Sequence, residues 1–485
     1  MPRLWPILAI LLLEVSPLFA TTVVATPTGS GTNTGVDWAH ACAGFTGNCA
    51  WSALNRGDTL WFGGGSTHYA GQGTMSQPES GTGLITIQGA TASIHGPATG
   101  WTNSLGVDST PAIWDMNAFS SIAGNNFVTL RTGYWIINGS VASDPTNPAT
   151  YGIQFAHPDC THDYIPIFYG DSSGQTIDHV NIQYPALDMS GCGTASIARR
   201  LVDGGAQGQR TNNTVSHWYC NGCQNGVTIR NPPGTTSDGD VIEYGYSVNS
   251  FDDTTHHGTC VTMFGTVTNV TIRYNKCANI TGTGGILAET VGGAGGAIYG
   301  NLLGADNCVP TCNNGIIAVT SDSYMTGMHV YNNALPNSAA GEPWWQGCIS
   351  GNPTQCAAAT GNVLENNIIW NQDCALVGGD NPTHDHNSYL SCLDTAPTET
   401  GGQVANLNPF INAGLLNFAL AIDTSAWTPL SSPYNVDITG ATITSSRGPY
   451  QFVAFQSGTF VPSGVFSGVI SELRLPDFTA TRLRP

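Results

Sequence analysis

The sequence predicts an all-β fold in which one chain winds into a coil of short, stacked strands, a solenoid. Only 9% of the 485 residues are charged and 60 are glycine, whereas helical surfaces usually carry many Glu and Lys. Aromatic and aliphatic residues remain plentiful, which argues against disorder. Short apolar segments also recur at a shared but variable spacing, as in proteins whose repeating turns stack. These features favour a coil over a helical bundle.

The charge balance excludes one class of partner. Thirteen Lys and Arg oppose 32 Asp and Glu, so the formal net charge is −19. Because nucleic-acid binding needs a basic surface, we expect no nucleic-acid partner. An acidic polysaccharide would also be repelled unless a metal ion or local basic side chains compensate.

The N-terminus is typical of an exported protein. Arg3 precedes the apolar run 4–13, and small residues follow around Ala20, which is the pattern of a secretory signal peptide over residues 1–20. The run is too short to cross a bilayer, which needs about twenty residues. We therefore expect a secreted protein, extracellular or periplasmic, without a membrane span. The rest divides into a coil domain, residues 21–452, and a C-terminal extension, residues 453–485, that can cover the last turn.

One repeated pattern is an apolar segment that closes on asparagine. The closing residues Asn275, Asn301, Asn333 and Asn367 are 26, 32 and 34 residues apart, and Gly245 holds the same place 30 residues before Asn275. Equivalent side chains of stacked turns lie above one another, about 4.8 Å apart. Asparagine tolerates left-handed backbone at a corner, and its amide can pair with the next one. We therefore predict a structural asparagine ladder without a catalytic role.

A second series of apolar segments runs between the first. Its members are Gly226-Val-Thr-Ile, Cys260-Val-Thr-Met, Gly285-Ile-Leu-Ala and Gly315-Ile-Ile-Ala. Neither a turn nor its neighbour can bury its apolar edge alone, so stacking gives them one continuous core.

Fourteen cysteines in an exported chain indicate disulfides. The spacing is compatible with seven pairs, although spacing alone does not establish the connectivity. The pairs are Cys42–Cys49, Cys160–Cys192, Cys220–Cys223, Cys260–Cys277, Cys308–Cys312, Cys348–Cys356 and Cys374–Cys392. Such bonds would hold loop insertions against the scaffold. A zinc or redox site at Cys220 and Cys223 is the alternative, but it lacks a second CxxC at a suitable spacing.

Three stretches carry a family resemblance. They are VVATPTGSG at 23–31 with RGDTLWFGGG at 56–65, the repeats within 210–372, and a degenerate end at 408–412, 417–420 and 448–452 that is similar to last turns of a coil. Through them the chain resembles the secreted right-handed parallel β-helix proteins of the pectate-lyase-like superfamily. The resemblance implies a single-stranded right-handed parallel β-helix with disulfide-pinned loop insertions. It implies a polysaccharide partner but no single activity, because this scaffold serves lyases, hydrolases, epimerases and adhesins. We expect a monomer.

Charged residues gather around the repeats. Glu243 and Arg273 take matching outward positions on neighbouring turns, and Lys276 follows closely. We expect Arg273 or Lys276 to be the base that removes the proton beside a uronate carboxylate. The alternative is that Glu243 and Arg273 form a cross-strand ion pair worth little.

The polar segment 249–258 supplies the other candidates. Asp252 and Asp253, together with Glu243, are the predicted Ca²⁺ ligands, because this ion prefers carboxylate oxygens. His256 or His257 is an alternative base or acid. Both aspartates also suit the capping of turns. The resemblance transfers no catalytic residue: His257-Gly258 is similar to a His-Gly-acid segment of some members of that superfamily, but this chain has threonine at position 259 where the acid would be.

Two further groups are candidates for binding. Trp344 and Trp345 can stack on sugar rings or cover the side of the coil. A loop with imidazole and carboxylate groups suits a metal, although such residues are more often bonded within turns. Its members are His157, Asp159, His162 and Asp163.

These patterns favour a secreted protein that acts on or binds a polysaccharide, with a calcium-assisted lyase as the preferred activity. Two alternatives stay open: a non-catalytic, adhesin-type glycan-binding protein, and a glycoside hydrolase that uses Asp252 and Asp253.

Overall fold

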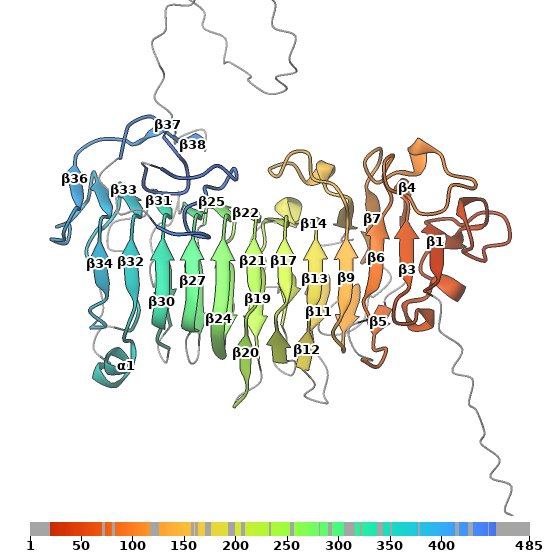
Figure 1. Cartoon of the computed structure of the whole chain (residues 1–485), viewed down its shortest axis with the longest axis horizontal. Coiled ribbons are helices and arrows are strands. Elements are labelled where there is room, and N and C mark those ends of the chain that lie inside the picture. Colours follow the sequence, from red (N-terminus) through yellow and green to blue (C-terminus); the bar gives the residue numbers. More distant parts are fainter. Residues whose placement is uncertain are drawn as a thin grey trace, which may run out of the picture. The chain divides into compact units, whose positions relative to one another are not determined.

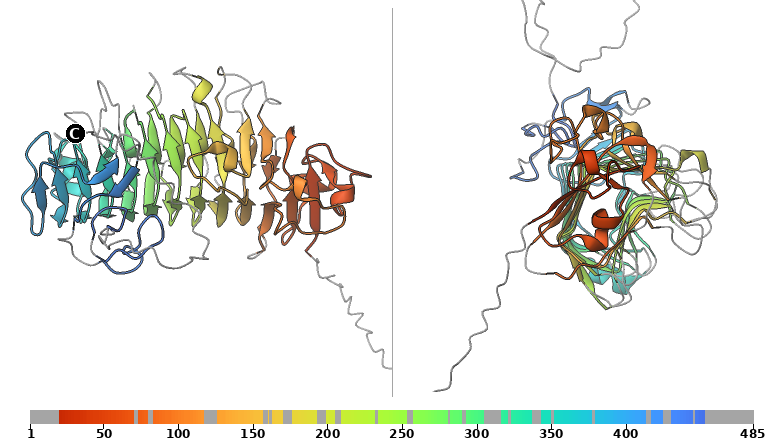
Figure 2. Two further views of the ribbon diagram at one scale, coloured as in Figure 1. Left: turned by 90° about the horizontal axis from the view of Figure 1, so that it is seen from above. Right: turned by 90° about the vertical axis from the view of Figure 1, so that its right-hand side faces the viewer.

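The computed structural model describes residues 20–452 with short gaps. The gaps are 70–72, 80–82, 117–125, 157–159, 161–162, 170–175, 193–198, 205–208, 232–233, 253–256, 281, 290–292, 305–315, 321–322, 337–342, 350–351, 377–378, 413–416, 425–429 and 445. The described chain is a parallel β-helix: three parallel sheets, here sheets A, B and C, wind around one core (Figures 1 and 2). The predicted all-β coil is confirmed. No helix of these residues is long and apolar enough to cross a membrane.

From Thr59 to Val319, each turn places one strand or strand pair in sheet A, then one strand in sheet B and one in sheet C. The later turns of the described chain add strands to sheets A and B, and the strands of each sheet are those of the described residues. Sheet A has sixteen strands: β1 Thr22–Thr26, β2 Cys42–Ala43, β3 Thr59–Phe62, β6 Ile85–Gly89, β9 Trp135–Asn138, β12 Thr176–Asp178, β13 Val180–Gln183, β16 Gln209–Thr211, β17 Thr214–Ser216, β20 Thr236–Asp238, β21 Val241–Glu243, β24 Thr266–Arg273, β27 Gly293–Tyr299, β30 Thr326–Tyr331, β32 Val363–Glu365 and β34 Thr383–Asp385.

Sheet B has twelve strands: β4 Gly65–Tyr69, β7 Ala112–Asp115, β10 Ile153–Ala156, β14 Pro185–Asp188, β18 Tyr219–Asn221, β22 Tyr246–Val248, β25 Lys276–Ala278, β28 Leu302–Leu303, β31 Ala334–Pro336, β33 Ile368–Trp370, β35 Ser388–Leu390 and β36 Gln403–Ala405. Sheet C has eight: β5 Gly73–Met75, β8 Val128–Leu130, β11 Ile167–Tyr169, β15 Arg200–Asp203, β19 Asn225–Arg230, β23 Thr259–Phe264, β26 Gly284–Glu289 and β29 Ile317–Val319.

Helical segments are short. The α-helix of the described residues is α1 Pro353–Ala358, and the 3₁₀ turns are η1 Trp38–His40, η2 Gly47–Cys49, η3 Trp51–Ala53, η4 Asn103–Leu105, η6 Pro148–Thr150 and η7 Ser190–Cys192.

The core consists of in-register apolar columns. In sheet A one column joins successive register partners, all fully buried: Val215, Ile242, Ile272, Ile298, Val330 and Leu364. Burial of each such side chain contributes about 1.5–3 kcal/mol. The column explains why apolar segments recur once per turn, since each turn covers the apolar edge of the one before it.

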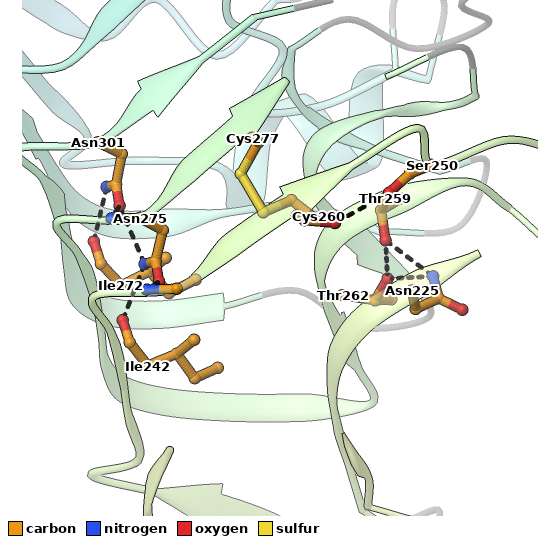
Figure 3. Close-up of a disulfide and its surroundings, with 12 residues drawn as sticks. Asn225, Ile242, Ser250, Thr259, Cys260, Thr262, Ile272, Asn275, Cys277 and Asn301 are labelled. Atoms are coloured by element: carbon orange, nitrogen blue, oxygen red, sulfur yellow. Dashed lines mark hydrogen bonds between the residues drawn. A yellow bond between two sulfur atoms is a disulfide. The ribbon is translucent and has the colours of Figure 1, made fainter. Parts of the chain in front are cut away.

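The asparagine ladder is confirmed and is longer than predicted. The Asn301 Oδ1 atom accepts hydrogen bonds from the backbone N–H of Asn275 at 2.9 Å and from its side-chain Nδ2 at 3.1 Å (Figure 3). The same pattern continues through Asn333 and Asn367 to Asn387. We expected left-handed backbone at the ladder asparagines themselves, but it occurs at the residue before each ladder position. The reason is that the ladder residue must point its side-chain amide inward. Its predecessors at this corner have positive φ: Tyr244, Tyr274, Gly300, Asn332 and Asn366.

Six of the seven predicted disulfides are present, and Cys308–Cys312 lies outside the described residues. Cys260–Cys277 is buried and joins β23 of sheet C to β25 of sheet B (Figure 3). Cys220 and Cys223 are bonded to each other, so the zinc alternative at this pair is wrong.

The end of the chain differs from the prediction. Residues 408–420 were expected to resemble worn turns of the coil, but β37 Phe410–Asn412 and β38 Asn417–Leu420 form an antiparallel pair. After it the chain returns to earlier turns, where Tyr274 Oη donates to the Val436 carbonyl at 3.3 Å. This region lacks the alternating inward apolar residues of a full turn, so packing back on the coil buries its aromatic side chains instead. Residues 1–19 and 453–485, with the predicted signal peptide and extension, lie outside the described residues.

Candidate functional site

The predicted charged site is divided between two sheets. Glu243 and Arg273 are register partners on β21 and β24 of sheet A, as expected. Their Oε2 and Nη2 atoms are 2.6 Å apart, and Arg273 Nη1 also donates to Tyr299 Oη at 2.8 Å. Burial lowers the pKa of Arg273, but the Tyr299 and Glu243 contacts outweigh it and raise the pKa above its ordinary value. A guanidinium held in this way is a poor base, and the ion-pair interpretation is confirmed.

Lys276 lies on β25 of sheet B and lines a pocket at the corner between sheets A and B, the corner pocket. The corner pocket is lined by Ala142, Pro145, Tyr151, His217, Tyr244, Gly245, Tyr246, Tyr274, Lys276, Ile438, Thr439 and Tyr450. Burial lowers the pKa of Lys276, and the charge of Asp144 opposes this.

Asp252 and His257 lie instead between β22 and β23, beside sheet C. Asp252 accepts hydrogen bonds from the backbone N–H groups of Gly258 and Thr283 and from Thr283 Oγ1. Asp253 and His256 lie outside the described residues. The structure therefore does not bring Glu243 and Asp252 into one cleft.

The described side chains do not fit the calcium site expected from Glu243 and Asp252. Glu243 is bound to Arg273, and Asp252 is occupied by Gly258 and Thr283. Among the described residues, no group of three or more His, Cys, Asp and Glu side chains is arranged to hold a metal. Calcium dependence stays a prediction.

A different set of charged side chains converges on sheet C. It lines a pocket of about 140 Å³, the sheet C pocket, whose lining residues are Arg200, Asn225, Thr228, Arg230, His257, Thr262, Phe264 and Glu289. Arg230, Phe264 and Glu289 are register partners that end β19, β23 and β26. In a chain with 9% charged residues, such a cluster is unusual, and it combines groups able to bind an anion and to move a proton.

One wall of the sheet C pocket is a guanidinium pair around a carboxylate. Asp203 is 2% exposed and forms ion pairs with Arg200 (Nη1–Oδ2, 2.5 Å) and Arg230 (Nε–Oδ1, 3.8 Å). The Arg230 guanidinium lies over the Phe264 ring, 4.6 Å from its centroid. The Nε atom of Arg230 has no hydrogen-bond partner among the described residues. This buried Nε faces Asp203 beyond hydrogen-bond distance, so the other N–H groups of the guanidinium are the ones available to a carboxylate ligand.

Asn225 connects this wall to the loop that carries His257. Its Oδ1 accepts from Arg200 Nε at 3.1 Å, and its Nδ2 donates to the His257 carbonyl at 3.0 Å. The same Nδ2 contacts the hydroxyls of Thr259 and Thr262 at 2.8 and 3.0 Å (Figure 3). Asn225 thus fixes the position of Arg200 relative to the loop that carries His257.

A hydrogen-bond chain sets the tautomer of His257. Thr283 Oγ1 donates to Asp252 at 2.8–2.9 Å and lies 2.7 Å from His257 Nδ1. A hydroxyl has one proton, so when Asp252 is ionised and accepts that proton's hydrogen bond, His257 Nδ1 carries the proton that it shares with Thr283. Neutral His257 then has its lone pair on Nε2. This is the arrangement of a histidine oriented as a general base.

Glu289 completes the sheet C pocket. Burial raises the pKa of its carboxyl, while the positive potentials of His257, Arg230 and Arg200 oppose the shift. Burial likewise raises the pKa of Asp252, against the hydrogen bonds from Gly258 and Thr283. A carboxyl whose pKa is raised keeps its proton to a higher pH than an ordinary carboxyl and can act as a proton donor.

The sequence interpretation missed four charged members of this site. They are Arg200, Asp203, Arg230 and Glu289. A signal was present in the second repeat series, because Arg230 and Glu289 follow equivalent segments and therefore stack in register.

The tryptophan prediction is also corrected. Trp344 and Trp345 are fully buried, and their Nε1 atoms donate to the Cys374 carbonyl and to Asp380. They pack in the core and cannot stack on a sugar. In the second candidate metal loop, Asp163 is described, whereas His157, Asp159 and His162 are not.

Comparison with known proteins shows likeness in architecture. No protein-family model and no curated protein matches the sequence. Among solved structures, the chain is similar to pectate lyase Pel9A, with 14% identity over 89% of this chain and 96% of that one and a TM-score of 0.39. It is also similar to the PL6 family polysaccharide lyase Pedsa3628 from Pseudopedobacter saltans, with 13% identity over 80% and 96% of the two chains and a TM-score of 0.36.

A third similar structure is the tailspike protein of E. coli bacteriophage HK620 in complex with a pentasaccharide. The identity is 11% over 67% of this chain and 58% of that one, with a TM-score of 0.33. Similarity at this level carries no information about the chemistry of the site.

Proposed function

We propose that the sheet C pocket binds a uronate-containing polysaccharide and cleaves it by β-elimination. The observation that supports this most directly is the presence of an oriented histidine and an arginine in one pocket. His257 is held by Thr283 and Asp252, and Arg230 lines the same pocket with its guanidinium over the Phe264 ring. Removal of a proton beside a carboxylate needs both a base and a cation.

The proposed step uses three side chains. Arg230 binds the uronate carboxylate, which makes the proton on the adjacent carbon more acidic. His257 Nε2 takes this proton, the electron pair left behind forms a carbon–carbon double bond, and the bond to the leaving sugar oxygen breaks. Glu289 gives its proton to that oxygen. The products are an unsaturated uronate and a new chain end.

The two arginines of the pocket also counter the repulsion between this acidic chain and an acidic polysaccharide. With a net charge of −19, long-range repulsion opposes a polyanion, and the Arg200–Arg230 pair, partly neutralised by Asp203, supplies positive potential locally. Calcium can add to this effect, but no step above depends on it.

The test is turnover by the purified full chain on pectate, alginate and a neutral glycan, with and without EDTA. Unsaturated products, followed by ultraviolet absorbance, support the proposal. New reducing ends without unsaturation indicate hydrolysis, and retention on a glycan without turnover indicates binding only. Loss of activity with EDTA, restored by Ca²⁺, would confirm calcium dependence.

A matched pair of variants connects the activity with sheet C. Arg230→Ala should lower kcat/KM about 10–100-fold, the worth of one charged hydrogen bond. Arg273→Ala removes the same group from sheet A and should leave kcat/KM within about twofold, since an ion pair of this kind contributes little. The opposite ranking would move the site to sheet A.

We also propose that the protein acts outside the cytosol. Six disulfides are expected in an oxidising compartment. N-terminal sequencing of the secreted protein should then begin at Thr21. Retention of the first twenty residues would contradict the signal-peptide prediction.

A further inference from the structure

The corner between sheets A and B carries a column of stacked aromatic rings. His217, Tyr244 and Tyr274 follow β17, β21 and β24, with ring centroids 4.9 and 5.1 Å apart. Their φ angles are 51°, 51° and 57°. Left-handed backbone costs such side chains about 1–2 kcal/mol each, and later turns place Gly300, Asn332 and Asn366 there instead. The aromatic choice in these three turns is therefore not required by the corner itself.

A second column of aromatic rings lies beside the first, on sheet B. Tyr219 and Tyr246 are register partners with stacked rings, 5.8 Å between centroids. The next register partner of Tyr246 is Lys276. Lys276 is the only lysine in the sequence. The two aromatic columns thus end beside the ammonium group of Lys276.

Two other segments turn this platform into a pocket. The loop with Ala142, Pro145 and Tyr151 forms one wall, and the returning chain with Ile438 and Tyr450 forms another. The enclosed volume is about 180 Å³. The aromatic residues are contributed by several separate turns, so the corner pocket exists only in the folded coil.

The corner pocket is lined by two nitrogen-bearing side chains, those of His217 and Lys276. The His217 Nδ1 atom is buried and has no hydrogen-bond partner among the described residues. Lys276 is half-buried, and burial lowers its pKa. A buried polar atom without a partner costs about 1–3 kcal/mol, and the half-buried ammonium is a donor that an anionic ligand can satisfy.

We propose that the corner pocket is a second saccharide site, which takes one sugar ring bearing a carboxylate. The sugar ring packs against Tyr246 and against the ring edge of Tyr244, whose two faces are covered by His217 and Tyr274, and the carboxylate pairs with Lys276. Aromatic side chains give apolar contact to the C–H groups of a sugar, and an ammonium in a half-buried setting favours an anion over a neutral group. The volume suits a single residue rather than a chain. The inference goes beyond the proposed lyase and does not require it.

The lone lysine provides a direct probe. Reductive ¹³C-methylation keeps the charge and labels only Lys276 and the N-terminal amine. Titration of the labelled full chain with D-galacturonate should shift the Lys276 signal to saturation. D-Galactose, the matched neutral sugar, should bind at least about tenfold more weakly, because it lacks the charged hydrogen bond. Absence of a saturable shift, or equal affinity for both sugars, would overturn the proposal.

Variants locate the binding, with calorimetry on unlabelled protein as the readout. Tyr244→Ala should abolish galacturonate binding, and Tyr244→Phe should retain it, which controls for folding. Lys276→Met should reduce the preference for galacturonate over galactose to about onefold while leaving polysaccharide cleavage unchanged.

An Arg230→Ala variant separates the two sites. It should keep the galacturonate-induced shift of Lys276, even if the sheet C proposal is correct and cleavage is lost. Disappearance of the shift in this variant would show that the sugar acts through sheet C and would refute the corner site. A lasting shift without any polysaccharide cleavage would instead refute only the lyase.

Discussion

The sheet C pocket and the corner pocket belong to neighbouring turns of one coil but differ in chemistry. The first combines Arg200, Arg230, His257 and Glu289, whereas the second is mostly aromatic with Lys276 as its cation. Their backbones explain the contrast. Between β24 and β25 the corner has two residues, whereas the connection from β22 to β23 spans residues 249–258.

Connection length thus determines what each region can present. A two-residue corner locked by the asparagine ladder forces successive side chains into register, and flat rings stack well at the strand spacing. A longer connection can fold over the ends of strands and bring groups such as His257 to Thr283. Varied chemistry is expected where loops are long, and repeated binding surfaces where corners are tight.

The largest expected difference between the regions is in turnover. His257→Ala should lower kcat about 10²–10⁴-fold, because it removes the proposed base. Initial rates of unsaturated-product formation measure this, with Tyr274→Phe in the corner as the control. A variant that keeps the wild-type rate would exclude His257 as the base.

The next effect concerns the positioning of that base. Thr283→Val removes the hydroxyl between Asp252 and His257, and kcat should fall about tenfold with the loss of one hydrogen bond. Thr283→Ser restores the hydroxyl and should recover the rate, a rescue that a purely steric role would not produce. Equal defects in both variants would show that packing, rather than the chain of hydrogen bonds, matters here.

A smaller effect is expected on stability as a function of pH. Burial raises the pKa of Glu289 above its ordinary value of 4.5. Its contribution is therefore most favourable below that pH and is lost as pH rises through the folded-state pKa, because ionisation in the pocket costs free energy.

Glu289→Gln stays neutral, so its stability advantage over the wild type should grow with pH above about 4.5. The expected size is on the order of 1 kcal/mol, measured by denaturation at several pH values. Lys276→Met serves as a control at the corner. A Glu289→Gln advantage that is constant with pH would argue against a raised pKa.

The smallest effect is expected for the sheet A ion pair. A double-mutant cycle on Glu243→Gln and Arg273→Gln should give a coupling free energy below about 1 kcal/mol, with activity unchanged. Denaturation midpoints of the four proteins supply the measurement. A coupling of several kcal/mol, or loss of activity, would return this pair to the functional site.

Much of the fold was predictable because it repeats. The spacing of Asn275, Asn301, Asn333 and Asn367 led directly to the ladder, and the strand alignment placed Glu243 beside Arg273. Six disulfides also followed from cysteine positions. Local order sufficed in each case because neighbouring turns contact each other at equivalent positions.

The site was predictable only in part. His257 and Asp252 were chosen for their residue types, and they do lie beside sheet C. Their proposed partners Glu243 and Lys276 do not, because one turn visits three sheets and residues close in sequence can face different directions. Trp344 and Trp345 show the same limit, since aromatic character alone does not distinguish a core side chain from a sugar platform.

The amino-acid sequence by itself determined that this chain stacks its turns, since apolar edges and asparagine amides recur once per turn and find equivalent partners above and below. The tertiary structure alone decided which outward side chains meet. Arg200, Arg230, His257 and Glu289 come from four separate segments and share one pocket. The physical reason is that stacking depends on a local period, whereas a site depends on loop paths and on the direction in which each sheet faces.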